Sequence, residues 1–173
     1  MGLVSLIVHV LLAAVLVGPQ ILMFFAVSPA SWLIEDDDVR QGVVRVIAKR
    51  FAALTVLALV GLLITGLIQF YDEAVVPPSI QESMNDYRWG QIFMWKMTLF
   101  LVLIGMIAFH AMVLAKRIGR VTEEVKAGRL ERWELERARR NSLVFSGFMI
   151  LVSIGILALG VMLAYAPFAD ATV

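Results

Sequence analysis

The sequence predicts an all-α fold: an integral membrane up-down four-helix bundle that forms a single domain over residues 1–173. Hydrophobic residues make up 61% of the chain and charged residues 17%, whereas soluble domains carry about 25% charged residues. Four apolar runs are each long enough to cross a hydrocarbon core of about 30 Å. Little chain remains outside these runs, so no separate soluble domain is expected.

The first helix is predicted over residues 3–34, which is too long for the apolar region of a signal peptide. No Lys or Arg precedes the run, which also argues against a cleaved leader. Pro19 follows Gly18 inside it, and a proline that lacks its N–H is expected to bend the helix.

Three further helices are predicted over residues 51–71, 89–118 and 142–167. Charged stretches join them at 35–50, 72–88 and 116–140. The pair Pro77-Pro78 is expected to stop any helix within 72–88. Residues 116–140 have a helical pattern, which is typical of a solvated extension of the third helix. The alternative is a helix that lies on the anionic inner leaflet.

Basic residues are distributed unevenly among the connections. Residues 35–50 carry four Lys or Arg, residues 116–140 carry nine, and residues 72–88 carry one. Positive charge favours the cytoplasmic side, so the first and third connections are predicted to be cytoplasmic. Residues 72–88 and both termini then lie outside, in the periplasm, and the chain is a multi-pass protein of the inner (plasma) membrane.

Several chemistries are excluded by what the sequence lacks. There are no cysteines, which removes disulfides, thiolate metal sites and c-type haem attachment. No nucleotide-binding glycine pattern, HExxH or GxSxG motif occurs. The basic stretch is mixed in sign and next to the membrane, so nucleic acid is not an expected partner.

Three ionisable residues lie well inside the apolar runs: His9, Lys96 and His110. Such groups are costly in a membrane and are functional candidates. His9 and Lys96 lie at nearly the same level near the outer face, because their helices run in the same direction. His110 lies fourteen residues beyond Lys96, which is about 21 Å deeper at about 1.5 Å per residue. The two histidines are therefore not expected to share one haem iron.

The other helices bring polar or sulfur-containing side chains to these two levels. Met162 and Tyr165 are expected near the outer level, as are Thr65 and Gln69. The inner level of His110 is expected to hold Met149, Gln20 and Met23. Imidazole, lysine amine and thioether groups can all bind haem iron, and histidine with methionine also suits Cu(I).

Each candidate has a purely structural alternative. An intramembrane histidine can hydrogen-bond a hydroxyl or carbonyl of a neighbouring helix. Lys96 can extend its amine toward the interface. Methionines more often fill packing space than bind metals.

Three segments resemble those of the CopD-like (copper-resistance protein D) and HemJ-like membrane protein families. They are HVLLAAVLVG at 9–18, KRF at 49–51 leading to LLITG at 62–66, and YRWG at 87–90 leading to WKM at 95–97. Their order and spacing resemble the first three helices of these families, over about the first 120 residues.

The resemblance implies a bundle of four to five membrane helices. In HemJ-like proteins an early histidine on helix one and a lysine on helix three are tied to haem b and to protoporphyrinogen oxidation, and His9 and Lys96 match those positions. His110 resembles a third-helix histidine of HemJ-like chains. CopD-like membership implies copper handling instead.

The leading hypothesis is a membrane protein that binds haem b, with His9 as the first iron ligand and Lys96 or Met162 as a sixth ligand or propionate partner. A second haem at His110, with Met149, would form an electron-transport path across the bilayer. The alternatives are copper transport and an accessory subunit of a larger membrane redox complex. Expected partners are lipid and a redox protein, with a homo-oligomer or a larger complex left open.

Overall fold

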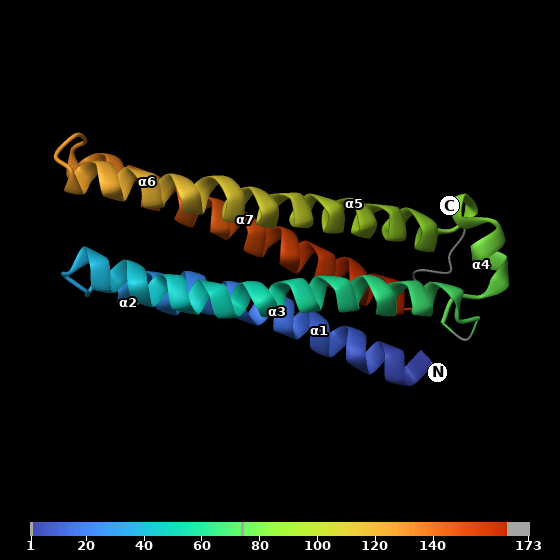
Figure 1. The fold of residues 1–173 in the computed structure, drawn as a ribbon. Helices are drawn as coiled ribbons and strands as arrows, with labels where there is room; N and C mark the ends of the chain where they lie inside the picture. Colours follow the sequence, from blue (N-terminus) through green and yellow to red (C-terminus); the bar gives the residue numbers. More distant parts are fainter. Residues whose placement is uncertain (1, 74, 166–173) are drawn as a thin grey trace.

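The computed structural model describes residues 2–73 and 75–165, and this part of the chain is helical, without strands (Figure 1). Four helical stretches are long and apolar enough to span a membrane, which confirms the predicted fold class. They cover Gly2–Ser31, Asp37–Tyr71, Arg88–Lys126 and Arg132–Ala164. The chain is a multi-pass membrane protein by this architecture.

The first spanning stretch combines α1 (Gly2–Leu22), a π-helical segment (Met23–Val27) and α2 (Ser28–Ser31). Pro19 lies inside α1 without ending it. The π-helical segment begins four residues after Pro19. The helix ends three residues earlier than the predicted boundary at 34, where the last residues form a turn.

The other two long helices of the bundle core are α3 (Asp37–Tyr71) and α7 (Arg132–Ala164). Residues 35–50 and 116–140, predicted above as connections, are mostly helical. At about 1.5 Å per residue α3 is about 52 Å long, against about 30 Å of hydrocarbon. The charged ends of the helices therefore continue beyond the membrane, because a helix satisfies its own backbone hydrogen bonds in water as well as in lipid.

The third spanning stretch runs from α5 (Arg88–Phe109) through a π-helical segment (His110–Leu114) into α6 (Ala115–Lys126). Figure 1 shows α6 as a continuation of α5 beside α7. Residues 115–126 thus extend the third helix, as the first interpretation of residues 116–140 predicts. Gly128, at φ +68°, makes the turn into α7, since glycine adopts positive φ without strain.

A short helix, α4 (Pro78–Glu82), interrupts the connection between α3 and α5. The prediction that Pro77-Pro78 excludes a helix there is wrong, because Pro78 stands at the first helical position. A proline is tolerated at this position, since its missing N–H would have no helical partner there.

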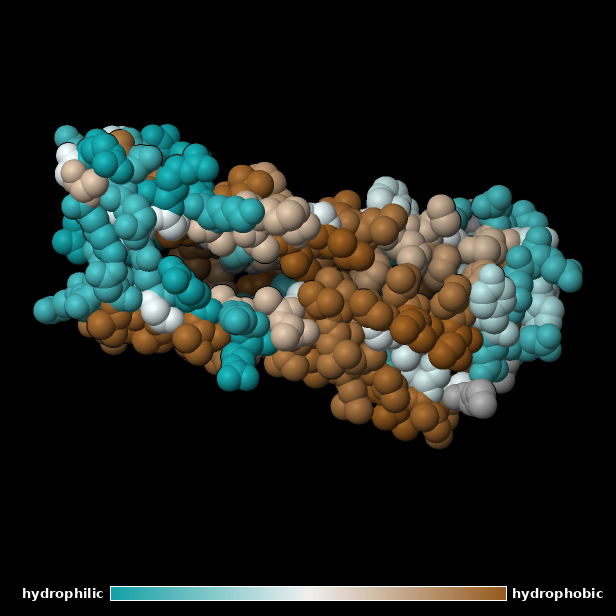
Figure 2. Space-filling view, viewed as in Figure 1, coloured by the Kyte–Doolittle hydropathy of each residue, from teal (hydrophilic) through white to brown (hydrophobic). Residues whose placement is uncertain are grey.

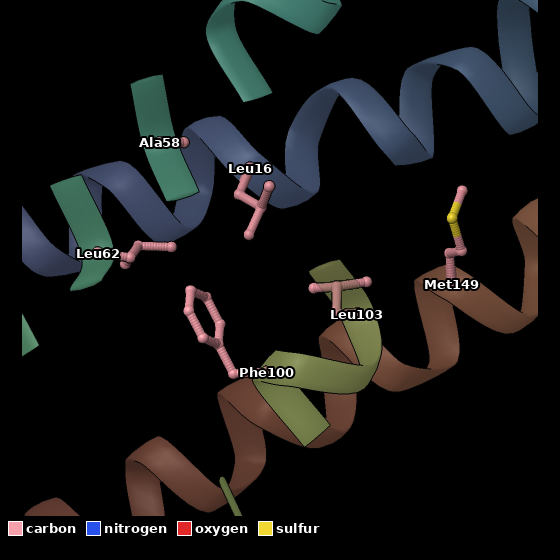
Figure 3. Close-up of a cluster of buried hydrophobic side chains, with 6 residues drawn as sticks. All are labelled: Leu16, Ala58, Leu62, Phe100, Leu103 and Met149. Carbon is pink, nitrogen blue, oxygen red and sulfur yellow. The ribbon is translucent and has the colours of Figure 1, made fainter. Parts of the chain in front are cut away.

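Two antiparallel hairpins build the bundle: α1 packs on α3, and α5 packs on α7. Side chains from all four helices meet in a central apolar cluster (Figure 3). Its buried members are Leu16, Ala58, Leu62, Phe100, Leu103 and Met149. A second cluster around Val76, Ile80 and Trp89 closes the end that carries α4. The start of α1 and the end of α7 lie at this same end (Figure 1).

On the face that Figure 2 shows, hydrophobic side chains predominate along the middle, and hydrophilic ones gather toward the two ends. Large apolar residues such as Leu57, Leu101 and Leu151 are more than 60% exposed. Such an apolar girdle is compatible with contact to a lipid bilayer, which removes it from water.

Candidate functional site

His9, on α1, takes part in a hydrogen-bonded network with α3. Its Nδ1 atom lies 2.7 Å from Oγ1 of Thr65. Ser5 Oγ donates to the carbonyl of Thr65 at 3.3 Å, and Gln69 Nε2 donates to the carbonyl of Ser5 at 3.4 Å. The expectation that Thr65 and Gln69 lie at the level of His9 is confirmed by these contacts.

Gly66 lies directly beside the His9 ring. A Cβ atom on Gly66 would stand 3.5 Å from Cε1 of His9, which is ordinary van der Waals contact. One turn earlier on α3, a Cβ on Gly61 would stand 2.6 Å from Cδ1 of Leu12. The absence of side chains at these glycines lets α1 and α3 approach closely, and the imidazole is held between its own helix and α3.

Lys96, on α5, approaches this site from the other hairpin. A Cβ on Gly160 of α7 would lie 3.6 Å from Lys96 Nζ, and the lysine is partly buried. Its amine lies within electrostatic range of His9. No carboxylate or hydrogen-bond acceptor pairs with Nζ in residues 2–73 and 75–165. An imidazole and an amine without a protein counter-ion thus face the same layer of the bundle.

His110 has a different environment, at the start of the π-helical segment that follows α5. Its Nε2 atom lies 3.0 Å from Oγ of Ser142 and 3.3 Å from Oγ of Ser146, both on α7. Its ring stacks on Phe145, with 6.2 Å between centroids. Both histidines thus make the interhelical hydrogen bonding described above as the structural alternative for a membrane histidine, His9 with Thr65 and His110 with the two serines.

The two histidines occupy different levels of the bundle. Phe100 and Leu103 of the central cluster lie between Lys96 and His110 along α5. His9 bonds a residue of α3, whereas His110 bonds residues of α7. These partners agree with the expectation that the two imidazoles do not meet at one iron.

In the described residues neither Met149 nor Met162 forms a hydrogen bond with a histidine. Met149 is 8% exposed and packs in the central apolar cluster. Met162 is 37% exposed on α7. Their roles as ligands remain predictions that rest on depth along the bundle.

Three residues of α7 were not singled out by the sequence: Ser142, Ser146 and Ser153. Ser153 Oγ donates to Oε1 of Gln20 at 3.0 Å, which joins α7 to α1. The three serines are spaced by four and seven residues, so they lie on one face of a helix. That spacing was the available signal for a polar face directed into the bundle.

Metal-binding groups of the usual kind are not found in the described part of the chain. No group of three or more His, Cys, Asp or Glu side chains there could hold a metal ion. Two open surface hollows lie away from His9, Lys96 and His110. One is lined by Leu67, Ile68, Tyr71, Asp72 and Glu73, the other by Trp133, Glu136, Arg137 and Arg140.

A haem makes specific demands on such a site: an imidazole with one ring nitrogen held by the protein, and cations for its propionates. His9, bonded through Nδ1, fits the first demand, because ligating histidines donate their other N–H to a neighbour. Lys96, without a protein counter-ion in the described residues, fits the second.

The chain was compared with known proteins. No family model, curated protein or solved structure matches it.

Proposed function

We propose that this protein binds haem b in the membrane through Nε2 of His9, in electron transfer or in a porphyrin redox role of the HemJ-like kind. The observation that carries the proposal is the pairing of His9 with Thr65. It occupies Nδ1 and leaves Nε2 without a partner in the described residues. Metal-ligating histidines are held in this way by a second hydrogen bond.

Lys96 supports haem over a bare metal ion at this site. A Lys96 amine that carries its proton would attract the anionic propionates of a haem and repel Cu(I). Haem b, when bound, supplies one-electron redox chemistry of its iron. The chain supplies the imidazole, the cation and a water-poor layer next to the central apolar cluster.

His110 is the weaker ligand candidate. Its Nε2 atom already contacts two serine hydroxyls, and only Nδ1 is left for a metal. The single-haem form of the proposal therefore assigns His9 to the iron and His110 to helix packing. A second haem at His110 would require the contacts with Ser142 and Ser146 to break.

An absorption spectrum tests the proposal. The protein is expressed with adequate haem supply, purified in mild detergent, and compared with His9→Ala and with His110→Ala as the matched control. We expect a Soret band in the wild type and in His110→Ala, and its loss in His9→Ala. A wild type without a Soret band rules out haem binding. A band that persists unchanged in His9→Ala rules out the ligand assignment.

Copper handling and an accessory role are the alternatives, and each has its own readout. Copper analysis after Cu(I) loading, in wild type and His9→Ala, detects a copper site. Co-purification of partner proteins in mild detergent detects a larger membrane complex. Copper retained at His9 without a Soret band would replace the haem proposal by CopD-like copper handling.

A further inference from the structure

Two short contacts converge on the hydroxyl oxygen of Thr65. Oγ1 lies 2.7 Å from the carbonyl oxygen of Gly61, one turn earlier on α3, and 2.7 Å from Nδ1 of His9. A longer contact of 3.4 Å reaches the carbonyl of Leu62. A threonine hydroxyl has one proton to donate and two lone pairs to accept. Each of the two short contacts therefore needs a proton, and Thr65 can supply the proton of only one contact.

The carbonyl of Gly61 can only accept a hydrogen bond. Two oxygens separated by 2.7 Å have the usual spacing of an O–H···O hydrogen bond, and without a proton between them they would repel each other. Thr65 must therefore donate its proton to Gly61. The contact with His9 then needs a proton from the imidazole, which means that Nδ1 carries the hydrogen.

We propose that Thr65 is a positioning residue that holds His9 as the Nδ1–H tautomer and leaves the lone pair of Nε2 free. In water histidine favours the other neutral tautomer, with the hydrogen on Nε2, so the protein reverses the ordinary preference. A free Nε2 lone pair is an electron-pair donor for a metal or a base for a substrate proton. Its use as an iron ligand rests on the proposed function, while the tautomer itself does not.

Thr65 is itself held in place by the rest of the network. It is 8% exposed, and its carbonyl accepts the hydroxyl proton of Ser5. Gln69 in turn donates to the carbonyl of Ser5. These bonds hold the backbone of α3 at Thr65 against α1, on the side from which His9 reaches the hydroxyl.

His110 is the internal comparison within the same chain. Ser146 donates to the carbonyl of Ser142 at 3.0 Å, but Ser142 Oγ has no contact besides His110 in the described residues. Because the proton of Ser146 is used in its bond to the carbonyl, its 3.3 Å contact with Nε2 of His110 needs the imidazole proton, and Ser142 Oγ can accept from the same N–H. The contacts of His110 therefore favour the Nε2–H tautomer, the opposite of the one at His9. A change at Thr65 should leave the His110 signals unaltered.

Nitrogen NMR of the haem-free, full-length protein tests the inference. Histidine ring nitrogens are labelled with ¹⁵N, and spectra are taken at mildly alkaline pH, where protonated and bare nitrogens have distinct shifts. The chain has two histidines, so His110→Gln assigns the signals. Thr65→Val removes the hydroxyl at similar volume, and Thr65→Ser keeps it as the conservative control.

We expect the Nδ1–H tautomer for His9 in the wild type and in Thr65→Ser, and its loss in Thr65→Val. An Nε2–H tautomer in the wild type overturns the inference, even if Thr65→Val does not fold. An unchanged His9 spectrum in folded Thr65→Val also overturns it.

Haem affinity gives a second readout, because loss of a group that orients a metal ligand commonly weakens binding about 10- to 100-fold. Thr65→Val should weaken haem binding by such a factor, and Thr65→Ser should restore it. If His9 of the wild type carries its hydrogen on Nδ1 but the protein takes up no haem, only the proposed function is overturned. If the wild type binds haem but its haem-free form carries the His9 hydrogen on Nε2, only the positioning role of Thr65 is overturned.

Discussion

Asp37, in the first turn of α3, and Arg139, near the start of α7, form an ion pair although 102 residues separate them. The Arg139 Nη2 and Asp37 Oδ1 atoms are 3.2 Å apart. Asp37 also pairs with Arg40, and its neighbour Asp38 pairs with Lys126 of α6. These contacts join the two hairpins at the charged end, on the opposite side of the bundle from the cluster around Trp89.

Removing the link from Asp37 to α7 should loosen that end. We expect Arg139→Gln to lower the free energy of unfolding by about 1 kcal/mol, the upper range for exposed pairs, because this pair is only partly exposed. Thermal unfolding in detergent measures the change. Arg137→Gln is the matched control, since Arg137 forms no ion pair in the described residues. Equal effects of the two variants would contradict a role for the ion pair.

Gly90, in the first turn of α5, should not accept a side chain. A Cβ atom there would stand 1.9 Å from the backbone carbonyl oxygen of Met84. We expect Gly90→Ala to cost about 2 kcal/mol or more, because the backbone of the connection between α3 and α5 must move. Gly105→Ala is the control on the same helix, where no atom lies within 4 Å, and it should be tolerated. A similar unfolding temperature for the two variants would contradict this packing.

Loss of the His110 hydrogen bonds should affect stability and not pigment binding. We expect Ser142→Ala to cost about 0.6 kcal/mol, the average for an interhelical hydrogen bond in a membrane protein, and His110→Ala to cost more, because it also loses the contacts with Ser146 and Phe145. Because both remove the same contact, the double variant should cost less than the sum of the single ones. Additive effects, measured by thermal unfolding, would show that the two side chains do not interact.

Asp36 caps α3 and gives its first turn a pH dependence. Its carboxylate accepts from the N–H groups of Asp38 and Val39 at 2.8 and 3.1 Å, and these bonds hold the pKa of Asp36 below its ordinary value. A lowered pKa means that the cap is present above the ordinary Asp range and is lost as pH falls through the folded-state value. Amide hydrogen exchange of the first α3 turn, corrected for intrinsic rates, should rise on acidification. Asp36→Asn should abolish this dependence, and a wild type without it would contradict the cap.

The orientation inferred from basic residues can be tested because the chain has no cysteines. Single cysteines are introduced as Ser79→Cys in the connection predicted to lie outside and Glu131→Cys in the turn before α7. A membrane-impermeant maleimide added to intact cells should label Ser79→Cys only. Both should react after the cells are lysed. Labelling of Glu131→Cys alone in intact cells would reverse the predicted topology.

The sequence by itself determined the four spans and the order of the ionisable residues along each of them. The length of an apolar run and the rise per residue are local properties, and they do not depend on what the helix packs against. Thr65 and Gln69 were correctly assigned to the level of His9 for this reason. The ends of the helices could not be predicted from the sequence, because a charged segment such as 37–50 is equally compatible with a loop and with a helix in water.

Only the tertiary structure decided which side chains meet within a level. Depth alone paired His110 with Met149, yet the fold directs His110 to Ser142 and Ser146 and packs Met149 in the central cluster. Depth likewise did not show that His9 would bond Thr65 through Nδ1. The rotation of each helix about its axis sets these contacts, and that rotation is chosen by the packing of all four helices together.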